Sequence, residues 1–146
     1  MREIKFRAKT LKQDIWCYGS YFKHIKRQVG PIGDSLKDED IEHLMIIHGF
    51  ADWNMPIPIE VIPVKLATLG QFTGLCDKTG KQIYEGDIVK KDNGPVGKVI
   101  FERGQFSIFF PAGFFQIKLY PYCKDVVVIG NIYDNFELIE DEYKEE

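Results

Sequence analysis

The stretch that decides the fold is residues 87–132, which read DIVKKDNGPVGKVIFERGQFSIFFPAGFFQIKLYPYCKDVVVIGNI. Short apolar runs alternate here with turn residues, of which Asn93-Gly94 and Arg103-Gly104 are the clearest. Asn-Gly is a strong hairpin signal because both residues accept a positive φ. Several short strands at such close spacing are typical of a small barrel or sandwich. We therefore predict five strands, near 88–91, 96–102, 105–110, 114–120 and 125–132, as in an SH3-like barrel.

The same strand chemistry extends toward the N-terminus. Ile4, Phe6 and Ala8 alternate with basic residues, which is the pattern of a half-buried strand, and residues 14–23 (DIWCYGSYFK) predict a second, aromatic strand. Asp77-Lys78-Thr79-Gly80 has the chemistry of a type I turn. The remaining segments follow from local pattern: a short helical turn over 36–41, strands over 43–50, 71–75 and 82–84, a proline-bearing loop over 51–58 and an extended segment over 59–64.

These elements predict a mainly β fold. It comprises a small SH3-like β-barrel in the C-terminal half, an N-terminal β extension and at most one or two short helical segments. We expect residues 1–139 to form a single domain, with 1–85 as its β-rich N-terminal part and 86–139 as its barrel part. Residues 140–146 (EDEYKEE) carry five acids and one base and are expected to be a mobile acidic tail.

Charge and cysteine usage narrow the class of protein. Apart from the acidic tail the chain is about neutral, which is not the strongly basic profile of a nucleic-acid binder. Cys17, Cys76 and Cys123 are far apart and form no C-x-x-C pair, so neither a disulfide framework nor a zinc knuckle is indicated. The first 13 residues lack the apolar core of a signal peptide, and no apolar run approaches the roughly 20 residues of a membrane span. We expect a cytoplasmic protein without membrane association.

Three blocks of sequence are distinctive: residues 2–8 (REIKFRA), residues 69–89 (LGQFTGLCDKTGKQIYEGDIV) and residues 128–138 (VIGNIYDNFEL). Together they resemble the YopX-like family of phage and prophage proteins. The resemblance implies a gene carried by a phage or prophage in a bacterial cell, and an SH3-like barrel in the C-terminal half. It offers no assigned activity and therefore no catalytic residue to carry over.

No group of residues predicts catalysis, a cofactor or a metal. Residues 74–81 (GLCDKTGK) miss the spacing of a phosphate loop and are better interpreted as a hairpin turn. Glu85 and Asp87 flank a glycine, where acids usually bind local backbone N–H groups. Asp134, Asn135 and Glu137 lack the spacing of a calcium loop. No Cys–His pair is indicated by any local signal, although such partners need not be close in sequence.

Two segments are candidate binding surfaces. Trp53 and Met55 lie in the proline-bearing loop, either as exposed contacts for a protein partner or with Trp53 closing the end of the barrel. Rings for stacking on bases and cations for phosphates occur together near residues 18–27, with Tyr21, Lys23, Lys26 and Arg27 as the candidates. The alternative for that segment is a solvated edge strand whose bases prevent aggregation.

The leading hypothesis is a non-enzymatic binding module that acts on a host or phage protein. A nucleic-acid-associated accessory protein is the first alternative, and an enzyme with an unrecognised site is the second. The sequence leaves self-association open, since an apolar strand such as 126–129 serves equally well as core or as a pairing edge.

Overall fold

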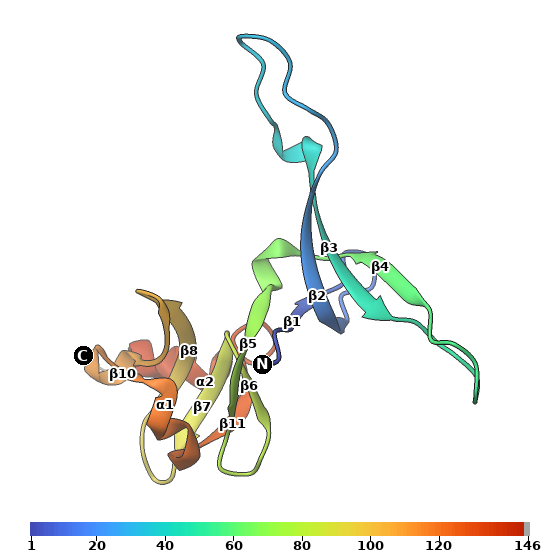
Figure 1. The fold of residues 1–146 in the computed structure, drawn as a ribbon. Coiled ribbons are helices and arrows are strands. Elements are labelled where there is room, and N and C mark those ends of the chain that lie inside the picture. The colour runs from blue at the N-terminus through green and yellow to red at the C-terminus, as the bar shows by residue number, and fades with distance from the viewer. Residues whose placement is uncertain (145–146) are drawn as a thin grey trace. The chain divides into compact units, whose positions relative to one another are not determined.

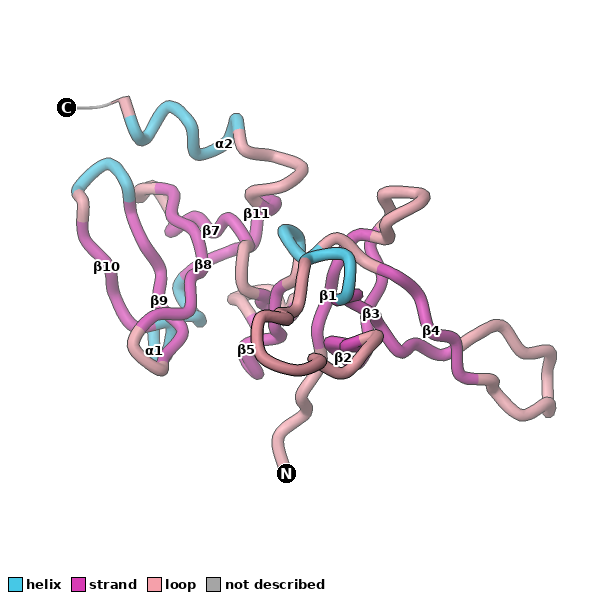
Figure 2. Tube along the Cα trace, turned by 90° about the horizontal axis from the view of Figure 1, so that it is seen from above, coloured by secondary structure: helices cyan, strands magenta, loops and turns pink. Residues whose placement is uncertain are grey.

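The computed structural model describes residues 1–144, which divide into two compact units (Figure 1). The first unit is Lys5–Leu69, and the second combines Met1–Ile4 with the chain from Gly70 onward. Strands dominate both units, and helices are confined to short segments (Figure 2). The prediction of a mainly β fold is therefore confirmed. No helix among residues 1–144 is long and apolar enough to span a bilayer.

The Lys5–Leu69 unit is an antiparallel sheet with strand order β4-β3-β2-β1. Its strands are β1 (Phe6–Lys9), β2 (Trp16–Ile25), β3 (Ile41–His48) and β4 (Ile59–Pro63), and short 3₁₀ turns lie at Asp38–Asp40 and Leu66–Thr68. The strands form because apolar side chains recur at every second residue and gather on one face. Ala8, Cys17, Met45 and Val64 are the buried core of that face.

Gly19 lies where the pairing partner of β2 changes from β1 to β3. Residues 16–19 pair with β1, whereas residues 20–25 pair with β3, beginning at Ser20 opposite Ile46. The strands approach so closely at this point that a Cβ on Gly19 would lie 2.2 Å from the carbonyl oxygen of Ile46. A residue without a side chain is therefore required where the pairing passes from one strand to the next.

The second unit contains a hairpin and a five-stranded sheet. The hairpin consists of β5 (Gly70–Cys76) and β6 (Gln82–Tyr84), and the sheet order is β10-β9-β8-β7-β11. The sheet strands are β7 (Asp87–Lys91), β8 (Val96–Glu102), β9 (Gln105–Phe110), β10 (Phe115–Lys118) and β11 (Val126–Asn131), and the two α-helices are α1 (Leu119–Tyr122) and α2 (Glu137–Glu140). The remaining 3₁₀ turns are Pro111–Gly113, Cys123–Asp125 and Asp141–Tyr143. Ile83, Val89, Val99, Ile108 and Val126 are among the buried residues of its main core.

Asp77 joins the hairpin to the sheet. Its buried carboxylate accepts hydrogen bonds from the N–H of Thr79 at 2.8 Å, the hydroxyl of Thr79 at 2.7 Å and the N–H of Lys81 at 2.9 Å. The second oxygen accepts the N–H of Val128, in β11, at 2.9 Å. The segment predicted as a hairpin turn rather than a phosphate loop is thus confirmed as the β5–β6 turn.

Several details differ from the sequence prediction, including the end of the strand expected over 114–120, where α1 begins at Leu119. The boundary between units falls at 69/70, and the expected division at 85/86 lies inside the second unit, because Ile83 of β6 packs in the core of the five-stranded sheet. The segment from 137 is helical through Tyr143, and Ile139 is fully buried against Ile88 and Val96. Of the acidic tail, residues 145–146 lie outside the described residues.

Strand pairing among residues 1–144 gives the five-stranded sheet two edges and no closed barrel, so the SH3-like closure stays a prediction.

Candidate protein-binding surface

The sheet of the Lys5–Leu69 unit has one buried face and one open face. The register places Ser20, Ile46 and Val61 side by side, and the next pairs along, Phe22 with Leu44 and His48 with Ile59, on the same face. Large apolar side chains on this open face are exposed: Tyr18, Phe22, Ile46, Ile59 and Val61. Contiguous exposed apolar surface of this kind commonly marks an interaction site.

Strand β4 forms the edge of this sheet, and its hydrogen-bonding groups alternate in direction. Gly49 N–H donates to Pro58 O at 2.8 Å, and Val64 N–H donates to His43 O at 2.9 Å, both toward the β3 side. Antiparallel pairing alternates every second residue, so Glu60 and Ile62 also bond to β3 while Ile59 and Val61 direct their backbone groups outward. Consistent with this, Pro63 O is on the outer side and accepts Leu11 N–H at 3.0 Å. The open part of the edge is therefore Ile59–Ile62.

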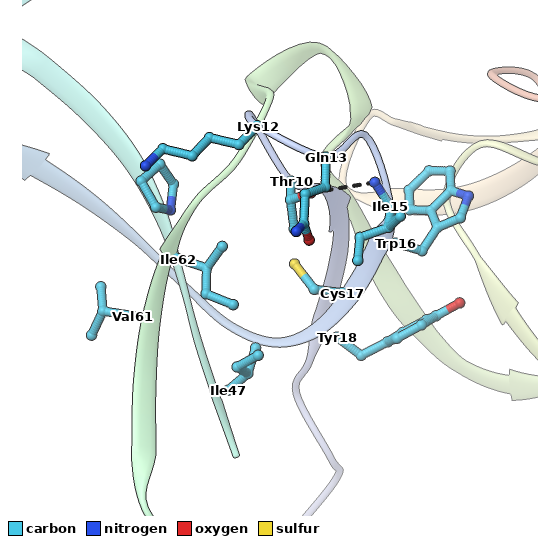
Figure 3. Close-up of a pocket in the computed structure, with 11 residues that line it drawn as sticks. Thr10, Lys12, Gln13, Ile15, Trp16, Cys17, Tyr18, Ile47, Val61 and Ile62 are labelled. Atoms are coloured by element: carbon cyan, nitrogen blue, oxygen red, sulfur yellow. Dashed lines mark hydrogen bonds between the residues drawn. The ribbon is translucent and has the colours of Figure 1, made fainter. Parts of the chain in front are cut away.

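An apolar cavity of about 470 Å³ adjoins this edge (Figure 3). Ile62 of β4, Cys17 of β2 and Ile47 of β3 line it from the sheet, and the β1–β2 turn closes one side with Thr10, Lys12 and Gln13. The turn is held by Thr10, whose hydroxyl accepts the N–H of Ile15 at 3.3 Å. The volume is within the range of sites that accept an apolar group.

The loop between β3 and β4 presents the predicted protein-contact residues. Trp53 is 92% exposed and Met55 is 62% exposed. Met55 N–H donates to Asp52 O at 3.0 Å, and Asn54 adopts φ 66°, so a tight turn displays the tryptophan. The alternative that Trp53 closes the end of a barrel is wrong, because so exposed a ring fills no core. The structure thus places Trp53 and Met55 in the loop that leads into β4.

Of the four residues of the predicted basic face, Tyr21 and Lys23 lie on the same face of β2, whereas Lys26 and Arg27 lie beyond the end of the strand. Tyr21 points to the buried side, where its hydroxyl lies 2.6 Å from Nδ1 of His43, and burial raises the pKa of its phenol. Lys23 lies opposite His43 on β3. Lys26 lines a cavity of about 770 Å³ together with the acidic residues Glu39 and Glu42.

Arg27 is committed to the β2–β3 loop rather than to solvent. Its guanidinium binds both carboxylate oxygens of Asp34 at 2.8 and 3.0 Å, Asp40 at 3.0 Å and the carbonyl of Ser35 at 2.8 Å. The pKa of Arg27 is raised by Asp34 first and then by Asp40. The Arg27 pair and the N–H of Gly30 lower the pKa of Asp34 in turn. An arginine with this many partners orders a loop and is not available for phosphate contacts.

We expect Arg27→Lys to loosen residues 28–40 while the sheet stays intact. Lysine carries a point charge and cannot reproduce the bidentate contact with Asp34 and the bond to Asp40 together. Hydrogen exchange measured by mass spectrometry should show faster exchange at Gly30, whose N–H donates to Asp34 at 2.6 Å. Lys26→Ala is the matched control, and unchanged exchange in Arg27→Lys would contradict the assigned role.

The other candidate residues have contacts that suit a structural role. Burial raises the pKa of the Cys17 thiol despite its contact with Ala8 O, which is the opposite of nucleophile activation. Asp87 is 2% exposed and accepts the N–H of Tyr84 at 2.8 Å, in line with the turn-forming interpretation. The amide oxygen of Asn131 accepts the N–H groups of Tyr133 and Asp134. Among the described residues, no three His, Cys, Asp or Glu side chains are grouped to hold a metal ion.

The open β4 edge and its cavity were not predicted as a site. The sequence does carry a signal for the edge, because Pro58 precedes the strand and Pro63 is its last residue, and proline in sheets is confined to edges, strand ends and bulges. The cavity has no comparable signal. Its lining comes from the β1–β2 turn and three strands that are distant in sequence.

Comparison with known proteins finds a family and a solved structure that match nearly the whole chain. Residues 5–140 match the family described as YopX protein. Protein EF1440 from Enterococcus faecalis, known from its crystal structure, is similar with a TM-score of 0.53 and 23% sequence identity. That alignment covers 96% of this chain and 100% of the other, and at this identity it shows a shared fold alone. No curated protein matches.

Proposed function

Because the chain belongs to the YopX protein family, as its match over residues 5–140 shows, we propose that it is a phage- or prophage-encoded accessory protein and a non-enzymatic protein-binding module. Its site is the open edge of β4 with the adjoining cavity, together with the exposed Trp53 loop. We propose that it works in the cytoplasm of the bacterial cell and that its partner is a host or phage protein.

The observation that carries this proposal is the edge itself. Ile59 and Val61 direct backbone groups outward, and their side chains are 71% and 56% exposed. Proteins usually protect sheet edges with charges, bulges or a covering segment. Here one charged residue, Glu60, interrupts an otherwise apolar edge. Addition of an extended segment to such an edge is a common mode of peptide recognition, in which backbone bonds supply affinity and side-chain pockets supply specificity.

The nucleic-acid alternative has weaker support. Its strongest cation, Arg27, is engaged by Asp34 and Asp40, and Tyr21 lies on the buried side of the sheet. We also keep the SH3-like architecture of residues 86–139 as a proposal, which the antiparallel order of five strands supports.

Val61→Pro tests the proposed edge. The variant removes an outward N–H without removing a bond to β3, so the sheet should persist while strand addition is blocked. Tagged wild-type and variant proteins are used to capture partners from a lysate of the host bacterium, with and without nuclease, followed by mass spectrometry. We expect a discrete partner that survives nuclease and is lost with Val61→Pro.

Val61→Ala is the matched control, because it shortens the side chain but keeps the N–H. It should retain most of the captured partner, and circular dichroism should show all three proteins folded. Partners that disappear on nuclease treatment, or that bind Val61→Pro as well as the wild type, would contradict the proposal.

A further inference from the structure

Resting on the proposed function, we infer that the β4 edge selects an extended segment of another protein with a lysine or arginine opposite Glu60 and apolar residues on either side. Glu60 is the only charged residue of β4 and is exposed. It forms no ion pair with any residue of the described part of the chain. Its carboxylate is therefore available to pair with a basic side chain of a bound protein.

The register of an added strand defines where that cation lies. Ile59 and Val61 would exchange backbone bonds with the new strand, which places Glu60 in the intervening pair without hydrogen bonds. Side chains in such pairs are close, about 4.5–5.5 Å between Cβ atoms, and opposite charges there are favourable. The residue opposite Glu60 shares the face of Ile62 and Cys17, which line the cavity.

The neighbouring positions are expected to be apolar. In the antiparallel orientation, the residue two before the base would lie opposite Ile62, next to the cavity. The residues immediately before and after the base would lie beside Val61 and Ile59 on the open face. The expected pattern is therefore apolar, apolar, base, apolar. The added strand ends there, because Leu11 already pairs with Pro63.

The same geometry disfavours a second copy of this chain. Two β4 edges pair with the most backbone bonds when Ile59 of one copy lies opposite Val61 of the other. Glu60 then directly faces its own symmetry mate. Like charges in that position are destabilising, so the charge pattern favours a basic partner over self-pairing.

The test is selection from a library of random dodecapeptides displayed on phage, carried out against the full wild-type chain and separately against Glu60→Lys. Glu60 is exposed, and the substitution leaves the backbone bonds of β4 in place. We expect lysine and arginine to be enriched within apolar segments for the wild type, and aspartate and glutamate for the variant. In the best synthetic peptide, exchanging the base for glutamate should weaken binding about tenfold in fluorescence anisotropy, since repulsion replaces attraction. The same exchange should strengthen binding to Glu60→Lys.

The other outcomes contradict either the inference alone or the inference together with the proposed function. Loss of binding to Val61→Pro shows that a selected peptide needs the open edge. If peptides of this kind show no charge preference opposite Glu60, the inference is overturned and the proposed function stands. Peptides that bind Val61→Pro unchanged, or failure to select any peptide, would overturn both. A dimer in sedimentation velocity that Val61→Pro dissociates would identify a second copy as the occupant and overturn the inference.

Discussion

Gly19→Ala is expected to lower the free energy of unfolding of the Lys5–Leu69 unit by about 3 kcal/mol, the upper range for inserting a methyl group into a packed site. The added Cβ would lie 2.2 Å from the carbonyl oxygen of Ile46 and 3.1 Å from its carbon. Both atoms belong to the backbone of β3, so no side-chain rotation can relieve the overlap. The contact between β2 and β3 must open at the position where β2 passes from one neighbour to the other.

Chemical denaturation measures this loss, and hydrogen exchange locates it. Faster exchange is expected in β2 and β3, with the strands of the second unit unchanged. Gly33→Ala is the matched glycine control: its Cβ would meet nothing within 4 Å, and it bears only the cost of φ +97°, about 1 kcal/mol. If Gly19→Ala unfolded within about 0.5 kcal/mol of the wild type, the ordinary scatter of surface substitutions, the close approach would be wrong.

The strands could be predicted because their boundaries are local. Arg103-Gly104 turns with φ values of 53° and 78°, and Asn93 adopts φ 53° where the Asn-Gly signal placed a turn. The helix α1 was missed, because four residues after an apolar strand carry no helical period. The unit boundary at 69/70 was missed for another reason. Whether β6 packs with earlier or later strands depends on contacts across the fold, which local pattern does not encode.

Some features of the candidate site also follow from local sequence, whereas others depend on contacts across the fold. The exposure of Trp53 follows from a loop rich in proline, which sequence alone identifies. Tyr21 and Lys23 share a face of β2, because side chains two residues apart in a strand point to the same side. The engagement of Arg27 depends on how the β2–β3 loop folds back, since its acid partners lie 7 and 13 residues further along. An open edge likewise exists only once the strand order is known.

Asp77→Ala is expected to destabilise the second unit by about 3 kcal/mol, because buried backbone N–H groups would lose their acceptor. Burial would raise the pKa of the Asp77 carboxyl, but hydrogen bonds from Val128, Thr79 and Lys81 outweigh it and hold the pKa below its usual value. One side chain thus bonds to the β5–β6 turn and to β11 at once. This supplies a physical role for the Asp-Lys-Thr-Gly portion of the most distinctive block of the sequence.

The charge of Asp77 should make the free energy of unfolding depend on pH, which packing alone would not do. A carboxyl whose pKa is lower in the folded chain stabilises it fully above the unfolded value, near 3.9, and this contribution is lost as pH falls through the folded value. Asp77→Asn removes the charge and turns an amide NH₂ toward either Val128 N–H or the turn, so it too is destabilising at neutral pH. The difference in unfolding free energy between wild type and Asp77→Asn, measured by urea denaturation from pH 7 to pH 3, should therefore shrink with acid. A difference that stays constant over this range would show that Asp77 acts by shape rather than by its charge.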